Sequence, residues 1–196
     1  SYFGAAALYA DYSMINMRET GIWGNYSEYD GGGMFITNSS GEIESSNIEN
    51  NSSLIGGGIN LVDSDFILNN LSLINNLAFE YGGGIYISGG SFEVNNAVIR
   101  ENYANNSGGA GITIGQGSSG IIRNSTISNN VAGASPSSGD GGGIMIYSSY
   151  NNSSTVRIEN SLITYNDARK KGGGIYTQAY SHIELINSNL IGNTVN

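Results

Sequence analysis

The amino-acid sequence predicts an all-β fold, a single-stranded parallel β-helix (solenoid) of about seven coils of ~26 residues, with three short strands per coil. Three observations predict it: a recurring glycine triplet, a recurring asparagine in register with it, and short segments of alternating apolar and polar residues. Of the 196 residues, 93 are Gly, Asn, Ser or Thr, and none is Cys. Because large side chains are scarce, the fold must depend on backbone regularity.

The glycine triplet sets the period of the repeat. Gly-Gly-Gly followed by Ile or Met begins at Gly31, Gly56, Gly82, Gly141 and Gly172, and residues 5–8 and 109–112 are degenerate copies. The apolar residues that close these motifs are Leu8, Met34, Ile59, Ile85, Ile112, Ile144 and Ile175, with spacings of 26, 25, 26, 27, 32 and 31 residues. We expect the glycines to occupy corners that need a positive φ or a close backbone approach.

An asparagine follows each apolar anchor by 17 to 22 residues. The seven are Asn25, Asn51, Asn76, Asn102, Asn130, Asn166 and Asn193, and the residues three and eight before them are apolar in every repeat. Stacked carboxamides can hydrogen-bond along the solenoid axis, so this column predicts an internal asparagine ladder. Five repeats carry another Asn six residues earlier, as at Asn70 and Asn124, which predicts a second ladder column.

Alternating segments such as Ile85-Tyr86-Ile87 indicate short strands with one buried face, and no segment indicates a helix. Stacking the coils at about 4.8 Å buries their apolar faces. Residues 1–196 then form one domain, either part of a longer solenoid or the subunit of a filament. The alignment also places three arginines beside a carboxylate of the next coil, in the pairs Arg18 and Glu44, Arg123 and Glu159, and Arg157 and Glu184.

Two repeats resemble those of a known family of surface proteins. Gly82-Gly83-Gly84-Ile85 is followed by Phe92-Glu93-Val94-Asn95, and Gly56-Gly57-Gly58-Ile59 by Phe66-Ile67-Leu68-Asn69. They resemble the GGA-aliphatic and FxxN motifs of the polymorphic outer membrane protein (Pmp) family of autotransporter adhesins. The resemblance implies a right-handed parallel β-helix displayed outside the cell, with a role in adhesion or surface coating. It implies no catalytic residue, because the family motif is architectural.

Composition narrows the possible partners. With 7 basic and 16 acidic side chains the net charge is −9, which disfavours binding to nucleic acid. No apolar run reaches the roughly 18 residues that a membrane-spanning helix needs. The resemblance implies an extracellular or cell-surface protein, and we expect neither a cofactor nor a metal. The protein's expected partner is either another copy of itself, through end-to-end or lateral assembly, or a host or cell-surface protein or glycan.

An enzyme is the alternative, because parallel β-helices also include polysaccharide lyases and pectin hydrolases. Hydrolysis of that kind needs clustered carboxylates, and the nearest approach is Asp63-Ser64-Asp65. The basic cluster Arg169-Lys170-Lys171 and the single histidine, His182, lack a recognisable partner motif. We expect no catalysis. A carbohydrate-active β-helix, either a polysaccharide lyase or a polysaccharide-binding module, remains the alternative.

The candidate recognition residues are aromatic. The outward positions after the anchors include Tyr9, Phe35, Tyr86 and Tyr176, which predict an exposed stripe able to stack on sugar rings or accept a protein. Cross-strand packing is the other interpretation of this stripe. The long segments 133–140, with the only proline, Pro136, and 147–155, with Tyr147 and Tyr150, interrupt the period and are further candidates.

Glycosylation is a further hypothesis, because nine Asn-x-Ser/Thr sequons occur. Asn38, Asn105, Asn151 and Asn152 are the candidates expected in loops. Sequon asparagines assigned to the ladder columns, namely Asn25, Asn70 and Asn124, are expected to be inaccessible.

Overall fold

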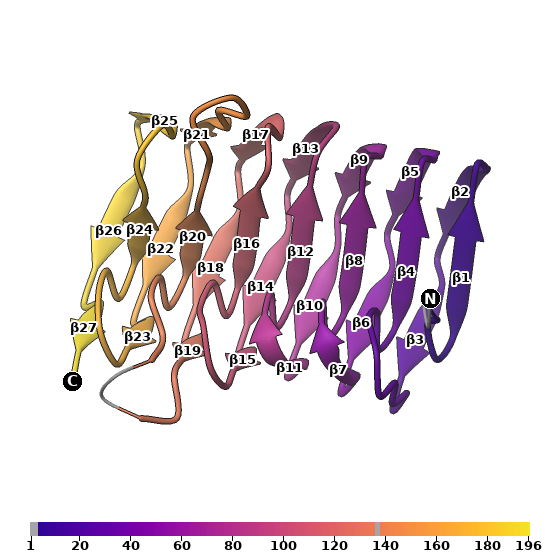
Figure 1. Ribbon diagram of the computed structural model, residues 1–196, viewed down its shortest axis with the longest axis horizontal. Coiled ribbons are helices and arrows are strands. Elements are labelled where there is room, and N and C mark those ends of the chain that lie inside the picture. Colours follow the sequence, from indigo (N-terminus) through magenta and orange to yellow (C-terminus); the bar gives the residue numbers. More distant parts are fainter. Residues whose placement is uncertain (1–3, 136–137) are drawn as a thin grey trace.

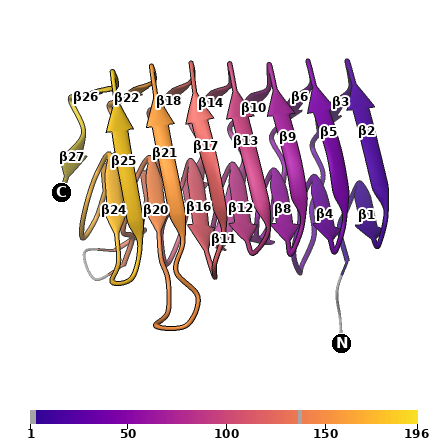
Figure 2. The ribbon, with the colours of Figure 1, turned by 90° about the horizontal axis from the view of Figure 1, so that it is seen from above.

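The computed structural model describes residues 4–135 and 138–196, so Pro136 lies outside the described residues. The chain forms strands and turns stacked as a rod, with one terminus at each end (Figure 1). Every strand pairing between coils is parallel, and each strand pairs with its counterparts in the adjacent coils. The paired strands form parallel sheets along the rod, and Figure 2 shows two of these sheets side by side. The predicted parallel β-helix is therefore confirmed.

Four sheets run along the rod. Sheet A contains β1 (Leu8–Asp11), β4 (Met34–Thr37), β8 (Ile59–Val62), β12 (Ile85–Ser88), β16 (Ile112–Gly115), β20 (Ile144–Ile146) and β24 (Ile175–Thr177). Sheet B contains β2 (Met14–Arg18), β5 (Ser40–Glu44), β9 (Asp65–Asn69), β13 (Ser91–Asn95), β17 (Ser119–Arg123), β21 (Thr155–Glu159) and β25 (His182–Ile186).

Sheet C contains β3 (Gly21–Trp23), β6 (Asn47–Glu49), β10 (Ser72–Ile74), β14 (Val98–Arg100), β18 (Thr126–Ser128), β22 (Leu162–Thr164) and β26 (Asn189–Ile191). Sheet D contains β7 (Ser52–Ile55), β11 (Leu77–Tyr81), β15 (Tyr103–Ala104), β19 (Val131–Ala132), β23 (Asp167–Ala168) and β27 (Thr194–Val195). Sheets A, B and C have a strand in all seven coils, and sheet D adds a short strand in six. The seven coils and their repeat of about 26 residues match the prediction.

The coil turns where single residues adopt the left-handed conformation. At the corner between sheets B and C these residues are Glu19, Ser45, Asn70, Asn96, Asn124, Asn160 and Asn187, with φ between 46° and 53°. Asparagine tolerates this conformation better than other non-glycine residues, which explains its recurrence here. The prediction of a second asparagine ladder is therefore wrong. Asn70 and Asn124 are exposed corner residues, so the expectation that they are inaccessible is wrong as well.

The glycine triplet has two separate physical causes. Gly82 has a φ of +66°, so the first glycine supplies the left-handed corner between sheets D and A. At Gly83, a Cβ would lie 2.5 Å from the carbonyl oxygen of Tyr103 and 2.7 Å from that of Ala110. The second glycine is thus required because the backbones of adjacent coils approach too closely for any side chain. Both parts of the glycine prediction are confirmed.

Columns of aliphatic side chains fill the interior. Ile43, Leu68, Val94, Ile122 and Ile158 occupy one register position on sheet B and are fully buried. Glycine replaces phenylalanine in the neighbouring column at Gly41 and Gly120, which pair with Phe66 and Phe92. A Cβ at Gly120 would lie 2.6 Å from the ring of Phe92. The departure from FxxN at Gly120 therefore gives the Phe92 ring its space, whereas a Cβ at Gly41 would meet the backbone of Ile15.

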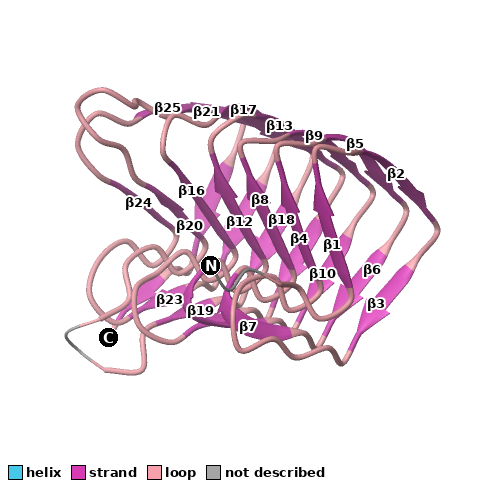
Figure 3. Cartoon of the chain, turned by 45° about the vertical axis from the view of Figure 1, so that its right-hand side comes forward, coloured by secondary structure: helices cyan, strands magenta, loops and turns pink. Residues whose placement is uncertain are grey.

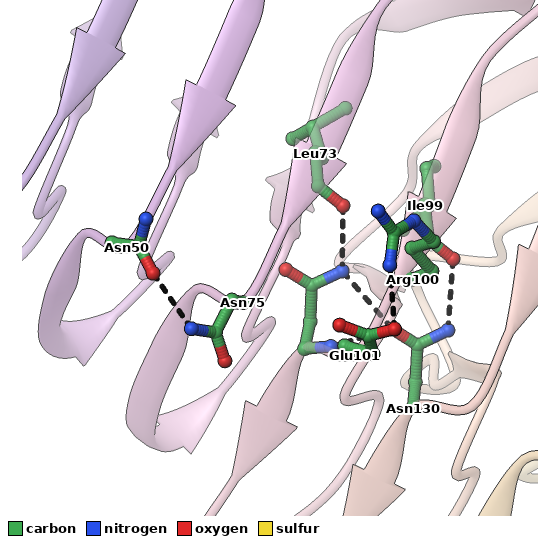
Figure 4. A network of polar contacts seen from close by, with 8 residues as sticks. Asn50, Leu73, Asn75, Ile99, Arg100, Glu101 and Asn130 are labelled. Atoms are coloured by element: carbon green, nitrogen blue, oxygen red, sulfur yellow. Dashed lines mark hydrogen bonds and ion pairs between the residues drawn. The ribbon is translucent and has the colours of Figure 1, made fainter.

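The asparagine ladder is confirmed along all seven positions. The Nδ2 of Asn102 donates to Oδ1 of Asn130 at 3.0 Å and to the carbonyl of Leu73 at 3.0 Å. The backbone N–H of Asn102 also donates to Oδ1 of Asn130, at 2.9 Å. Figure 4 shows the Asn130 carboxamide beside the carbonyl of Ile99, which accepts its next bond at 3.0 Å. Equivalent side-chain bonds link Asn25, Asn51, Asn76, Asn102, Asn130, Asn166 and Asn193.

Ion pairs on the outer face agree with the predicted register between coils. Arg18 pairs with Glu44 at 3.0 Å, and Arg157 lies 3.6 Å from Glu184. Arg123 lies beside Glu159 in register, but its guanidinium pairs with Glu93 of the preceding coil at 3.2 Å instead. Within the described ranges, no helix long and apolar enough to cross a membrane is present.

Candidate functional site

The two long loops project from the same side of the rod. They follow β19 and β20, in the coils where the repeat lengthens, and in Figure 3 they lie on either side of strands β20 and β24. A groove of about 220 Å³ lies next to the first loop. Its lining is Tyr81, Asn106, Ser107, Ser138, Gly139, Asp140, Met145, Lys170 and Gln178. Residues from five successive coils thus meet at this place.

Three tyrosines form a cluster at the edge of this groove. The ring of Tyr81 stacks on that of Tyr147, with centroids 6.1 Å apart and planes 28° apart, and lies 6.3 Å from the ring of Tyr86. The hydroxyl oxygens of Tyr86 and Tyr147 are 2.6 Å apart. Burial raises the pKa of Tyr147, and the neighbouring Tyr86 adds to the effect. This hydroxyl therefore stays protonated at neutral pH.

Asp140 is the most unusual polar group of the site. It is 8% exposed, and its Oδ1 is buried without a hydrogen-bond partner in the described chain. Its Oδ2 lies 4.0 Å from the ammonium of Lys170. The next residue, Lys171, places its ammonium 5.4 Å from the centroid of the Tyr176 ring. A buried carboxylate oxygen without a partner is costly.

Tyr81 and Asp140 are site residues that were not predicted from the sequence. Both occupy the position directly before the glycine motif. Residues at this position form isolated parallel β-bridges from coil to coil, which pair Tyr81 with Gly108, Gly108 with Asp140, and Asp140 with Lys171. The fixed offset from the glycine motif was the signal that could have identified them. The basic cluster has no recognisable partner motif in the sequence, whereas the structure brings Lys170 to Asp140.

The exposed aromatic stripe is only partly present. Tyr9 is 48% exposed, but Phe35 is only 4% exposed, so its expected exposure is wrong. Tyr86, Tyr147 and Tyr176 are half-buried, and Tyr150 is 77% exposed, with its ring edge-on to Tyr180 at 5.6 Å. The outward positions between the aromatics are buried as well: Asn60, Thr113 and Met145. Recognition by these residues stays a prediction. Tyr86 and Tyr147 contact Tyr81, which lines the groove, whereas Tyr9 and Phe35 lie in the first two coils.

The glycosylation candidates differ in accessibility. Asn38 is an exposed corner residue whose Nδ2 donates to Oδ1 of Asp11 at 3.1 Å, and Asn105 is half-buried. Asn151 and Asn152 are exposed in the loop that follows β20. Their modification remains a prediction.

The other residues considered for catalysis, Asp65 and His182, do not line the groove. Asp65 accepts hydrogen bonds from the N–H and Oγ of Ser91, at 2.8 and 2.6 Å, which hold its pKa below the ordinary value. His182 is exposed at the start of β25. Over the described ranges, no three His, Asp or Glu side chains are grouped so as to hold a metal ion.

Comparison with known proteins agrees with this architecture. A search of curated protein sequences found no match. A family model described as "right handed beta helix region" matches residues 32–196, most of the chain. The protein therefore belongs to the family of right-handed β-helix proteins.

Proposed function

We propose that this protein is a non-catalytic, adhesive β-helix of the extracellular surface that binds a glycan through the groove beside sheet A. The observation that carries the proposal is the meeting of the Tyr81 ring, on which Tyr147 stacks, with the Asp140 carboxylate and the Lys170 ammonium in one groove. The Pmp-like glycine and FxxN motifs support a surface role, because proteins with such repeats are displayed outside the cell.

The lining suits a sugar. A sugar ring presents an apolar C–H face, which packs on aromatic rings such as Tyr81, and hydroxyl groups, which hydrogen-bond to charged and amide side chains. The Asp140 carboxylate accepts from one hydroxyl, and Lys170 and Gln178 donate to its neighbours. The groove is smaller than the ~300–1,000 Å³ of enclosed small-molecule pockets. A short stretch of a longer glycan, lying across an open surface, is therefore the ligand that fits it.

The distribution of carboxylates supports adhesion over hydrolysis. Glycoside hydrolysis commonly uses two carboxylates that flank the scissile bond, about 5–9.5 Å apart. Among the described residues that line the groove, Asp140 is the one carboxylate. A binding role needs only that acceptor and the aromatic surface.

Glycan binding can be tested on an array of neutral and acidic glycans, followed by calorimetry with the best ligand. Asp140→Asn keeps the shape of the side chain but removes the charge, and we expect it to weaken binding about tenfold or more, since a hydrogen bond to a charged group contributes about 1.5–3 kcal/mol. Asp167→Asn is the matched control, because Asp167 bonds Thr194 and Asn196 and does not line the groove. Equal binding by Asp140→Asn, or no binding to any glycan, would contradict the proposal. Release of reducing ends or unsaturated uronic acids from polysaccharide would favour the enzymatic alternative.

End-to-end assembly is a second candidate, favoured by the open end of the ladder. The last ladder position is Asn193, whose Oδ1 accepts from the N–H and Nδ2 of Asn166, both at 3.0 Å. Leu185 and Leu190, which belong to inward columns, are each 45% exposed there. A further coil, from the same polypeptide or from the first coil of a second copy, would cover them. Sedimentation of the 196-residue chain distinguishes the two, because a monomer at all concentrations would argue against assembly between copies.

A further inference from the structure

The contact between Tyr86 and Tyr147 is built from three different coils. Tyr86 belongs to β12 and Tyr147 directly follows β20, so the strand β16 lies between them in sheet A. Tyr147 crosses this strand at Gly115, where a Cβ would lie 2.3 Å from the Tyr147 ring. The absence of a side chain at Gly115 is therefore what allows the two hydroxyl oxygens to approach to 2.6 Å.

This geometry suits oxidative coupling of the two phenols. Loss of one electron and one proton from each tyrosine gives two phenoxyl radicals, whose unpaired spin resides on the oxygen and on the ring carbons ortho to it. A bond between two ortho carbons, followed by return of their hydrogens to the oxygens, restores both aromatic rings and both hydroxyls. In the product the two hydroxyls flank the new carbon–carbon bond, and the structure already places the two hydroxyl oxygens 2.6 Å apart.

The surroundings favour this pair over other tyrosines. Both rings are half-buried, which admits a small oxidant but keeps each ring in one place. The Tyr81 ring, stacked on Tyr147, further restricts its rotation. Because burial raises the pKa of Tyr147, its hydroxyl is protonated at neutral pH and loses its proton together with its electron on oxidation. The chain has 13 tyrosines and no cysteine, so tyrosine coupling is the covalent cross-link open to it under oxidation.

We propose that Tyr86 and Tyr147 are a modification site at which a peroxidase-type oxidant forms an intramolecular dityrosine. Hydrogen peroxide takes up the two electrons and two protons that the tyrosines lose and is reduced to two molecules of water. The new bond joins residues 61 positions apart and ties the loop after β20 to the fourth coil. Like a disulfide, it restricts the unfolded chain and so stabilises the fold. The proposal is independent of glycan binding.

The test treats the protein with peroxidase and hydrogen peroxide and measures dityrosine fluorescence, followed by tandem mass spectrometry of proteolytic fragments. We expect a cross-linked product, monomeric on denaturing gels, that weighs two hydrogen atoms less than the untreated chain, with its linkage at Tyr86 and Tyr147. Tyr86→Phe and Tyr147→Phe each abolish this product. The matched controls Tyr150→Phe and Tyr180→Phe remove one member of a more exposed tyrosine pair and retain it.

Other results would overturn the proposal. They are no intramolecular dityrosine, a linkage mapped to Tyr81 or to Tyr150 and Tyr180, or a product that survives in Tyr86→Phe. Circular dichroism of each variant before oxidation shows whether it folds. If a phenylalanine variant does not fold, the linkage mapped in the unmodified sequence still decides the outcome.

Discussion

Replacement of Asn102 by alanine tests whether the buried ladder holds the coils together. Oδ1 of Asn102 accepts from the N–H and Nδ2 of Asn76, at 2.9 and 3.1 Å, and its Nδ2 donates to Leu73 and Asn130. Alanine leaves the buried N–H of Asn76 and the carbonyl of Leu73 without this side chain. At about 1–3 kcal/mol for each buried group that loses its partner, the free energy of unfolding falls by roughly 2–6 kcal/mol. This is a large part of the ~5–15 kcal/mol of a typical domain.

The first position of the ladder supplies the control. Asn25 is half-exposed, and Oδ1 of Asn51 still accepts from the backbone N–H of residue 25 after mutation to alanine. Water can replace the lost bonds there, so Asn25→Ala should cost no more than about 1 kcal/mol. Urea unfolding followed by circular dichroism measures both variants, provided that the m-value is unchanged. If Asn102→Ala costs as little as Asn25→Ala, the ladder does not contribute to stability as argued.

Two further predictions concern the corners. Gly83→Ala should lower the free energy of unfolding by about 3 kcal/mol or prevent folding, because the new Cβ meets two backbone oxygens. Gly24→Ala should lower it by only about 1–2 kcal/mol, because residue 24 has a φ of +68° but no atom lies within 4 Å of the new Cβ. Equal urea midpoints for the two variants would contradict this. Burial and the nearby Glu80 raise the pKa of Asp30 above 3.8, so ionisation opposes folding at neutral pH. Asp30→Asn should therefore be more stable than the unmodified chain at pH 7, and the gain should vanish as the pH falls below 3.8, where Asp30 is protonated in both states; a gain that persists in acid would show that charge is not its cause.

The repeat could be predicted from the sequence because the glycine motif, the inward asparagine and the apolar positions each meet a local requirement that recurs from coil to coil. Ile85 and Ile112 align in the structure as their offsets from the glycine motif require. The column that includes Asn70 was misread because asparagine serves two purposes in this fold. It forms hydrogen bonds along the axis when it points inward, and it adopts the left-handed conformation when it lies at a corner. Composition alone does not separate the two uses.

The site was harder to predict because it depends on contacts between coils that no local pattern records. The expectation that Phe35 is exposed rested on strand alternation, which identifies the outer face of a strand but not what covers that face. The meeting of Tyr86 with Tyr147 depends on a missing side chain at Gly115, in a strand between them. The approach of Lys170 to Asp140 likewise joins corners of neighbouring coils.

The position of the groove follows from the regularity of the coil. Corners in the left-handed conformation and backbones in direct contact leave no room for an added residue inside the repeat, as at Gly83. When the period lengthens from 26 to 32 and 31 residues, the extra residues must therefore leave the coil at a corner. Both insertions border sheet A, so they enclose the same outer surface between them. Asp140 ends the first insertion and Tyr147 begins the second, and each is held by the regular strand beside it. The rigid repeat thus fixes the positions of the groove residues, and the first insertion adds Ser138, Gly139 and Asp140 to the lining.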